Sequence, residues 1–360
     1  MPSTRKTLIE VRYPSHRGVI GMRGSGGSLS WDQTTLATAR DGDVHLFELS
    51  LGENELVELK LVRNDDNWAA GRNFVVHAGD HFSIEPCFNR TTSQIMPMEP
   101  VVHGDITLSF DVLLPPSYDE QENKRYPVLY ALDAQALWSF SKDPFGVWDL
   151  ELTLDRLFEL DAIEEIIVVA VHTDKNRTDL LSPFADKQDR GGKGPKLLDT
   201  MVSMVKPVID ARFRTYTDRD STGILGSSMG ALFAFYAAWT RPDIFGKAAC
   251  LSSSFWWGQR GLIKAVQDQP TPNPRPVFYV DSGAAFDPHE RDPSARDGFH
   301  HTRSMARALL RHGYEAGRDL HRLTFTGQTH DAAAWAARVG IPMQLLFPKA
   351  PVAETSEAED

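Results

Sequence analysis

The first part of the chain combines short alternating apolar segments with turn-forming residues. Residues 44–51 (VHLFELSL), 56–63 (LVELKLVR) and 73–79 (NFVVHAG) have the length of strands, and Gly, Asn and Asp separate them. Alternation of apolar and polar side chains over such lengths is typical of strands with one buried face. A convincing long amphipathic helix does not occur before about residue 150. Residues 1–95 are therefore predicted to form a small, immunoglobulin-like β-sandwich.

From about residue 106 the pattern changes to continuous apolar runs that end in small or polar residues. These runs are 126–133 (YPVLYALD), 165–172 (EIIVVAVH), 222–228 (TGILGSS) and 276–283 (PVFYVDSG). Strands that are buried on both faces have this composition, and helical patterns lie between them. Alternating strands and helices predict a mostly parallel sheet, covered by helices on both faces, over residues 96–350. The acidic residues 351–360 are predicted to form a disordered tail.

Residues 224–234 (ILGSSMGALFA) contain the most specific local pattern of the chain. The stretch Gly226-Ser227-Ser228-Met229-Gly230 has the form G-x-S-x-G, with a buried-strand pattern before it and a helical pattern after it. A nucleophile elbow has this arrangement, because side chains at the two glycine positions would collide with the adjoining strand or helix. A Gly/Ser turn without chemistry is the alternative. We expect Ser228 to be a nucleophile.

A serine nucleophile needs a base, and chains with this elbow place the histidine after the last strand. His330 follows a short strand pattern (RLTF) and precedes a helical pattern (DAAAWAARV), so it is the predicted base. The acid that orients the imidazole should follow the preceding strand. Asp287 is favoured because it lies in the loop just past that strand, and Glu290 and Asp281 are the alternatives.

The same chemistry requires two backbone N–H groups that hold an oxyanion. One is expected from Met229, which directly follows the nucleophile in the elbow. The second is expected from the loop after the strand at 126–133, where Ala134 and Gln135 are the candidates. An ordinary helix start at this loop is compatible with that role.

Composition and charge narrow the class of protein further. The chain has 360 residues, 41% of them hydrophobic and 24% charged, as in globular proteins with a large core. The formal net charge is −11, which argues against nucleic acid or an anionic membrane as a partner. Two cysteines, Cys87 and Cys250, lie in unrelated contexts and build neither a disulfide framework nor a zinc site. The start of the chain lacks the apolar region of a signal peptide, so we expect a cytoplasmic location.

These motifs resemble the enterochelin-esterase-like branch of the α/β-hydrolases, within the esterase D superfamily that includes feruloyl and acetylxylan esterases. The resemblance is carried by YPVLYALDAQALW, NRTDLLSP, GSSMGALFAFYAAWTRPDIFGKAACLSSSFWW and GQTHDAAAW, within about residues 106–348. Members typically carry glycine at the position of Ala134. The resemblance implies an α/β-hydrolase fold, and that Arg177 meets an anionic or phenolic group of the substrate. A surface salt bridge is the competing interpretation of Arg177.

Four tryptophans are candidates for ligand contacts. Trp256 and Trp257 follow a strand on the side expected for Ser228, where they would line the substrate pocket or close the sheet. The segments around Trp31 and Trp68 are similar to starch- and glycogen-binding modules and to the sandwich of enterochelin esterases. Both side chains would then stack on a sugar, or pack in the core or against the neighbouring domain. The sandwich itself is expected to form one wall of the active-site cleft.

We therefore predict a serine carboxylic-ester hydrolase that acts through an acyl-enzyme and uses no metal or organic cofactor. Its expected ligand is a small-molecule ester of the siderophore type, such as a catecholate ester. An acetyl or feruloyl sugar esterase is the first alternative, and a non-catalytic binding protein on a hydrolase scaffold is the second. A homodimer is the oligomer to test for at this chain length.

Overall fold

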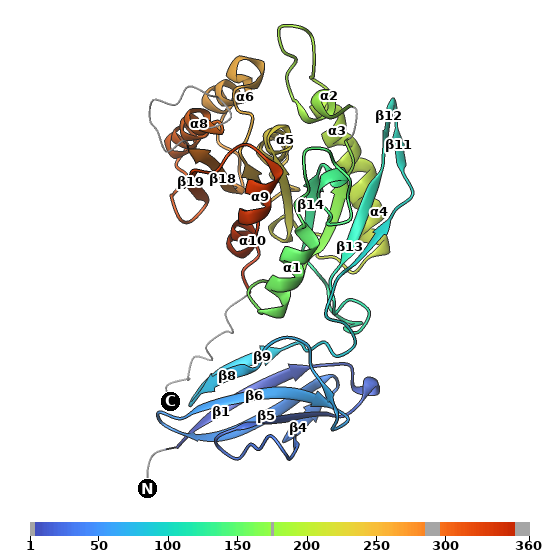
Figure 1. The fold of residues 1–360 in the computed structure, drawn as a ribbon, viewed down its shortest axis with the longest axis vertical. Helices are drawn as coiled ribbons and strands as arrows, with labels where there is room; N and C mark the ends of the chain where they lie inside the picture. The colour runs from blue at the N-terminus through green and yellow to red at the C-terminus, as the bar shows by residue number, and fades with distance from the viewer. Residues whose placement is uncertain (1–3, 174–175, 285–295, 350–360) are drawn as a thin grey trace.

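The N-terminal part of the protein consists of two sheets that share one core. The computed structural model describes residues 4–173, 176–284 and 296–349, and Figure 1 shows their arrangement. The sheets have the strand orders β4-β5-β1-β9 and β3-β2-β6-β7, with β8 paired to β6. Their strands are β1 (Thr4–Arg12), β2 (Ile20–Ser25), β3 (Thr35–Leu36), β4 (Ala39–Asp41), β5 (Val44–Gly52), β6 (Leu56–Arg63), β7 (Asn67–Trp68), β8 (Phe74–His77) and β9 (His81–Ile84).

Alternating side chains account for this core. Along β5 the side chains of Phe47, Leu49 and Leu51 are buried, and the positions between them are exposed. The inward-facing side chains of β6, which include Leu59 and Leu61, belong to the same apolar cluster. Successive side chains of a strand point to opposite faces, so one apolar face of each sheet is enough to close the core.

The larger part contains a mixed sheet of eight strands with the order β10-β13-β15-β14-β16-β17-β18-β19. The strands β10, β13 and β15 pair antiparallel, and all pairs from β15 to β19 are parallel. Their bounds are β10 (Gln94–Pro97), β13 (Phe110–Leu114), β14 (Val128–Leu132), β15 (Ile167–Val171), β16 (Thr222–Ser227), β17 (Lys247–Leu251), β18 (Val277–Ala284) and β19 (Leu320–Thr326). A separate hairpin consists of β11 (Val101–His103) and β12 (Ile106–Leu108).

Helices cover both faces of this sheet. On one face α1, α9 and α10 enclose an apolar cluster, and on the other α2 to α6 and α8 enclose a larger one (Figure 1). The helices are α1 (Leu150–Glu159), α2 (Arg177–Leu181), α3 (Gly194–Thr200), α4 (Lys206–Arg212), α5 (Met229–Thr240), α6 (Trp257–Asp268), α8 (Phe299–Arg311), α9 (Ala332–Arg338) and α10 (Gly340–Leu346), with a π-helical turn at Met201–Val205 between α3 and α4. The fold is that of an α/β-hydrolase. No helix in the described part of the chain combines the length and apolarity needed to cross a membrane.

The parallel strands bring three strained residues together at the carboxyl-terminal ends of the strands. Asp133 follows β14, Ser228 follows β16 and Ser252 follows β17, and these strands are neighbours. Their φ angles are 65°, 53° and 48°, in a region that side chains other than glycine rarely adopt. Backbone strain of this kind concentrates at functional sites, so this end of the sheet is the first place to look for chemistry.

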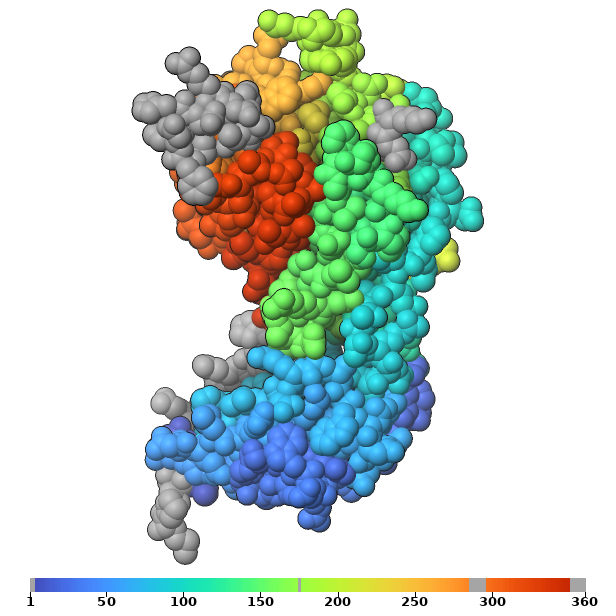
Figure 2. Space-filling model, in the orientation of Figure 1, coloured from blue at the N-terminus to red at the C-terminus, as the bar shows by residue number. Residues whose placement is uncertain are grey.

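The two parts meet at the amino-terminal ends of the parallel strands, opposite the end that carries Ser228. The loop 115–126, which leads into the start of β14, carries most of the contacts: Glu120 accepts hydrogen bonds from Tyr13 and Arg63, and Arg17 pairs with Glu122. Figure 2 shows the sandwich below the hydrolase body, joined to it along the segments near this loop. The expectation that the sandwich forms a wall of the active-site cleft is therefore wrong. The predicted boundary at 95–96 falls within β10, which begins at Gln94 and belongs to the large sheet.

A partly buried cation, Lys124, pairs with two carboxylates at this junction. The Lys124 ammonium lies 2.8 Å from a carboxylate oxygen of Glu85, just past the last sandwich strand, and 2.8 Å from one of Glu165, just before β15. Burial alone would raise the pKa of Glu165, but the attraction and hydrogen bond of Lys124 outweigh it and lower that pKa. The ionised carboxylate is thus stabilised by folding.

We expect Lys124→Met to lower the free energy of unfolding by about 2–4 kcal/mol at about pH 7, because two partly buried carboxylates lose their counter-charge. The pKa of Glu165 is lowered in the folded state, so its ion pair stabilises the fold at pH values above the ordinary pKa of a glutamate. This stabilisation disappears as the pH falls through the pKa of Glu165 in the folded state. The difference in the free energy of unfolding between the wild type and Lys124→Met should therefore shrink toward about pH 3. Urea unfolding at both pH values measures this.

Lys196→Met is the matched control for Lys124→Met. The pair between Lys196 and Asp105 has 60% and 62% of its side-chain surface exposed, so its loss should cost about 0–1 kcal/mol. Equal destabilisation by both substitutions would contradict the role of Lys124 at the junction.

Candidate active site

Ser228 lies at a sharp turn between β16 and α5. Its φ and ψ are 53° and −116°, and it immediately precedes the first turn of α5. A Cβ atom on Gly226 would lie 2.4 Å from the carbonyl carbon of Gly230, so glycine is needed at position 226 for the close approach of strand and helix. The local sequence therefore forms the elbow that it predicts, with the hydroxyl at the carboxyl end of a buried strand.

His330 lies next to this hydroxyl. It occupies the loop between β19 and α9, and its Nε2 is 2.9 Å from Ser228 Oγ. The ring packs edge-on against Trp335, with centroids 5.1 Å apart. Asp331 caps α9 by accepting a hydrogen bond from the Ala334 N–H, which fixes the backbone beside the histidine. The structure brings Ser228 and His330 together.

The carboxylate beside the imidazole belongs to Asp297. His330 Nδ1 lies 2.5 Å from Asp297 Oδ1, and the aspartate side chain is buried. Its second oxygen accepts hydrogen bonds from the Gly283 N–H at 2.5 Å and from the Ser252 hydroxyl. Asp287 and Glu290, two of the predicted candidates, lie outside the described residues. Asp297 was missed because it lies after the long loop, although the Asp-Gly pair before α8 is a turn signal close to a helix start.

Asp281, the third candidate, has a different partner. Arg338 of α9 reaches both of its oxygens at 3.1 Å, and the two side chains are 0% and 1% exposed. Tyr279 O–H and Ser252 N–H also donate to this carboxylate. Burial raises the pKa of Asp281, although the attraction of Arg338 opposes this effect. Asp281 does not contact His330 and instead holds a buried cation.

Arg338 connects this ion pair to the site. Its guanidinium donates to Ser252 Oγ at 2.5 Å and lies 3.4 Å from Asp297, and Ser252 in turn donates to Asp297. Gln328, two residues before His330, accepts a further hydrogen bond from the same guanidinium. Arg338 and Ser252 thus hold the carboxylate that faces His330 in place.

We expect Arg338→Leu to lower the free energy of unfolding by about 3–5 kcal/mol, because it leaves two buried carboxylates without a counter-charge. The midpoint of urea unfolding measures this loss. Arg318→Leu is the matched control, because Arg318 is 72% exposed and, among the described residues, pairs with the nearby Glu315 alone. If the two variants were equally stable, the buried pair would not be a major source of stability.

The predicted oxyanion donors lie at neighbouring strand ends. Met229 begins α5 after β16, and Ala134 and Gln135 begin a short 3-10 turn after β14, the strand paired with β16. A Cβ atom on Gly230 would lie 3.2 Å from Asp133 Oδ2, so the two loops are in close contact. These backbone positions share the end of the sheet that carries the Ser228 hydroxyl.

Arg177 is engaged in an ion pair rather than free. It donates to both oxygens of Asp133, at 2.9 and 2.8 Å, and Thr173 donates to the same carboxylate. A further contact of 3.4 Å reaches the Ser227 carbonyl oxygen. The salt-bridge interpretation thus describes its contacts, and the pair holds the loop after β14 against the elbow.

The two adjacent tryptophans differ in environment. Trp257 is buried and donates its indole N–H to the Phe184 carbonyl oxygen at 2.7 Å, whereas Trp256 is 50% exposed. Both line a hollow of about 270 Å³, together with Asp186, Arg190 and Gln259 among others. Ser254, two residues before Trp256, has its hydroxyl 3.2 Å from Ser228 Oγ. Trp256 therefore presents a half-exposed aromatic surface to this hollow, two residues along the chain from Ser254.

In the sandwich, Trp31 and Trp68 form an exposed pair. Their exposed fractions are 37% and 40%, and their ring centroids are 6.3 Å apart. The Arg23 guanidinium lies 5.5 Å from the centre of the Trp68 ring. The pair thus lies on the surface of the sandwich rather than in its core.

Among the described residues of both parts, no three His, Cys, Asp or Glu side chains are grouped so that they could hold a metal ion.

Comparisons with known proteins give a family match, a similar sequence and two similar folds. Residues 104–339 match the family model described as "Putative esterase". The uncharacterized protein YbbA of Bacillus subtilis is 27% identical over 154 residues, and the match covers 41% of this chain and 57% of YbbA, just over half its length. A ferulic acid esterase has a similar fold, with a TM-score of 0.54, 17% identity, and coverage of 71% of this chain and 98% of its own. The enterochelin esterase of Shigella flexneri has a TM-score of 0.53 at 13% identity, with 96% and 95% of the two chains covered.

Proposed function

This chain belongs to the Esterase family, and we propose that it hydrolyses carboxylic esters through Ser228, His330 and Asp297. The observation that carries the proposal is the continuous hydrogen-bonded path from Ser228 Oγ through the imidazole to a buried carboxylate. A serine hydroxyl becomes a nucleophile when a neighbouring base accepts its proton and a third group orients that base. Asp297 takes the role predicted for Asp287.

The proposed reaction proceeds through an acyl-enzyme. Ser228 Oγ attacks the ester carbonyl carbon while His330 Nε2 accepts the hydroxyl proton, and the oxyanion accepts hydrogen bonds from the Met229 N–H and an amide of Ala134 or Gln135. His330 then donates the proton to the leaving alcohol. Water attacks the acyl group in the same way and releases the acid. Asp297 orients the ring and stabilises the imidazolium that forms when His330 accepts the serine proton.

For the substrate we propose siderophore-type esters that carry catecholate groups. Trp256 offers a half-exposed aromatic surface two residues along the chain from Ser254, whose hydroxyl lies 3.2 Å from Ser228 Oγ, and such surfaces stack with aromatic rings. The likeness to the enterochelin esterase extends over both parts of the chain, which supports the same assignment at the level of fold.

An acetyl or feruloyl sugar ester is the second candidate. It is favoured by the exposed pair of Trp31 and Trp68, because paired exposed tryptophans stack on sugar faces, and by the fold of the ferulic acid esterase. In this alternative the sandwich would hold the carbohydrate at a distance from Ser228, since the sandwich contacts the amino-terminal ends of the parallel strands.

A substrate panel separates the two candidates. We expect kcat/KM to be highest for a catecholate trilactone, in its ferric or metal-free form, and lower for acetylated and feruloylated sugars. Trp256→Ala should lower kcat/KM for the catecholate ester by about tenfold, the loss of roughly 1.4 kcal/mol of aromatic contact. Trp31→Ala combined with Trp68→Ala should leave that value unchanged. A preference for sugar esters that the sandwich variant abolishes would favour the second candidate.

A further inference from the structure

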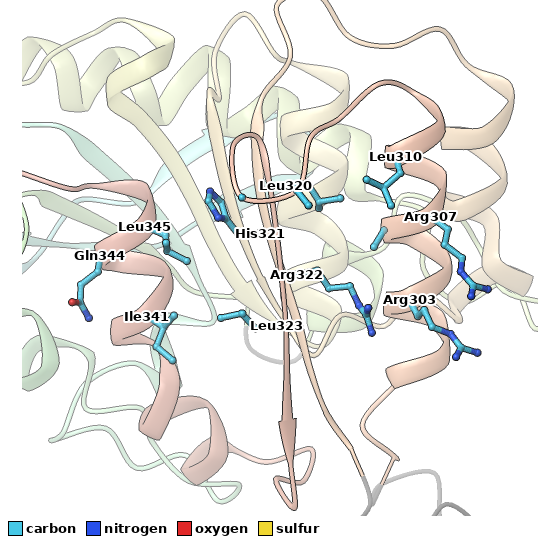
Figure 3. A pocket seen from close by; sticks show the side chains of 13 residues that line it. Arg303, Arg307, Leu310, Leu320, His321, Arg322, Leu323, Ile341, Gln344 and Leu345 are labelled. Atoms are coloured by element: carbon cyan, nitrogen blue, oxygen red, sulfur yellow. The ribbon is translucent and has the colours of Figure 1, made fainter.

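A hollow on the described surface lies along the edge strand β19, and none of the residues around Ser228 lines it. It has a volume of about 770 Å³, and α8 and α10 flank the strand on its two sides (Figure 3). β19 is the last strand of the large sheet, so one of its two edges pairs with β18. The other edge pairs with no strand of the described chain, although Leu320 at its start forms an isolated bridge with Ala316 there, so the open edge begins after Leu320. An open edge of this kind presents backbone N–H and C=O groups to any extended segment that approaches it.

The side chains of β19 alternate between the two flanking helices. Leu320 belongs to the apolar cluster of α8, and Leu323 packs against the cluster on the other face of the sheet, together with Ile341 of α10. Arg322 lies on the α8 side, with its guanidinium 5.6 Å from the centre of the Phe299 ring. A segment paired to this edge would also direct alternate side chains toward α8 and toward α10.

The α8 side of the groove carries concentrated positive charge. Arg303, Arg307 and Arg322 form no ion pair with a carboxylate of the described residues. Burial, and then repulsion from the other two guanidiniums, lower the pKa of Arg322. The chain as a whole has a formal net charge of −11, so this cluster reverses the prevailing sign.

The α10 side of the groove is largely apolar. Ile341 and Leu345 line it, with Gln344 between them, and Leu345 is 39% exposed. In Figure 3 these side chains lie across the strand from the arginines of α8. The two sides of the edge strand therefore favour side chains of different chemistry.

We propose that the free edge of β19 binds an extended segment of a partner protein, with Asp or Glu side chains toward α8 and apolar side chains toward α10. Backbone pairing would supply affinity, and the two sides of the groove would supply specificity. Carboxylates meet the unpaired guanidiniums in the geometry that arginine prefers. This surface does not depend on Ser228, so the proposal stands apart from the reaction.

A second copy of this chain is a poorer occupant of the groove. Antiparallel pairing of two β19 edges would bring two sets of three guanidiniums together without counter-charges, and like charges across an interface disfavour association. A nucleic acid would match the arginines but would leave Ile341 and Leu345 against a polar backbone. An alternating acidic and apolar strand satisfies both sides at once.

The test uses the full chain and a fluorescein-labelled peptide, TEVEVEVET, in a fluorescence anisotropy titration. Two peptides serve as controls: TKVKVKVKT reverses the charge, and TEEEEVVVT has the same composition as the probe without its alternation. We expect only the alternating acidic peptide to bind with a measurable Kd, and its binding to weaken as salt increases. Methylation of the backbone nitrogen at every second peptide residue removes the N–H donors on one side of the extended peptide. We expect it to abolish binding only when it blocks the side that faces β19, because only those N–H groups donate to the strand edge.

Charge reversal in the groove identifies the site. Arg307→Glu combined with Arg322→Glu should weaken binding of the probe by at least about tenfold, whereas Arg318→Glu, at an exposed position outside the groove lining, should change Kd by less than about twofold. Circular dichroism establishes that each variant is folded. Equal binding by the groove variant, or equal binding of the lysine peptide, would overturn the proposal. Self-association that the groove variant abolishes would overturn it in favour of a second copy.

Discussion

Ser228→Ala is expected to lower kcat/KM for p-nitrophenyl acetate by about 10⁴–10⁶-fold, the loss seen when a nucleophile that works with a base and an acid is removed. The reason lies in the chemistry of the site. Without the hydroxyl no acyl-enzyme forms, and the imidazole 2.9 Å away has no proton to accept. Steady-state hydrolysis of p-nitrophenyl acetate by the purified variant measures the effect.

The neighbouring serine provides the matched control. Ser227 is the last residue of β16 and is buried within the same motif, so Ser227→Ala removes a hydroxyl from the same segment while leaving the elbow unchanged. We expect its activity to stay within about threefold of the wild type. Mass spectrometry after reaction with an organophosphonate should place the adduct on the peptide that contains Ser228. Full activity of Ser228→Ala, or an adduct on another residue, would refute the proposed nucleophile.

Asp297→Asn is expected to lower kcat by about 10³–10⁴-fold. The carboxylate accepts a hydrogen bond from His330 Nδ1 and thereby leaves Nε2 free to accept the serine proton. An amide at this position can instead donate to Nδ1, which places the imidazole proton on Nε2 and removes the base. The ring would stay in place while its tautomer became wrong, so KM should change far less than kcat.

Two companion variants decide which carboxylate is the acid. Asp287→Asn tests the residue that the sequence favours, and Asp281→Asn tests the carboxylate that pairs with Arg338. The variant with the largest fall in kcat at unchanged fold identifies the acid. Near-ultraviolet circular dichroism must accompany these assays, because Asp297 also accepts hydrogen bonds from Gly283 and Ser252. If Asp287→Asn lost more activity than Asp297→Asn, the contact of His330 with Asp297 would be structural.

Residues whose role depends on their immediate neighbours could be predicted from the sequence. The elbow is set within five residues, because glycine is required at position 226 for the strand and helix to approach. Continuous apolar runs that end in small residues predict the buried strands, and this pattern needs no knowledge of distant contacts. His330 followed from chain order, since it lies between the last strand and the next helix.

Residues whose role depends on distant contacts could not be predicted. Several carboxylates follow β18 within a short stretch, and only the path of the backbone into α8 brings Asp297 to the imidazole. Arg338 lies in a helix pattern that would place arginine in solvent, yet two buried carboxylates surround it. The sandwich contacts the amino-terminal ends of the parallel strands because the loop 115–126 leads into the start of β14. No local sequence pattern indicates on which side of the sheet the sandwich packs. Local sterics and apolar patterning thus determined the elements and the nucleophile, and the packing of segments far apart in the chain decided which charges meet.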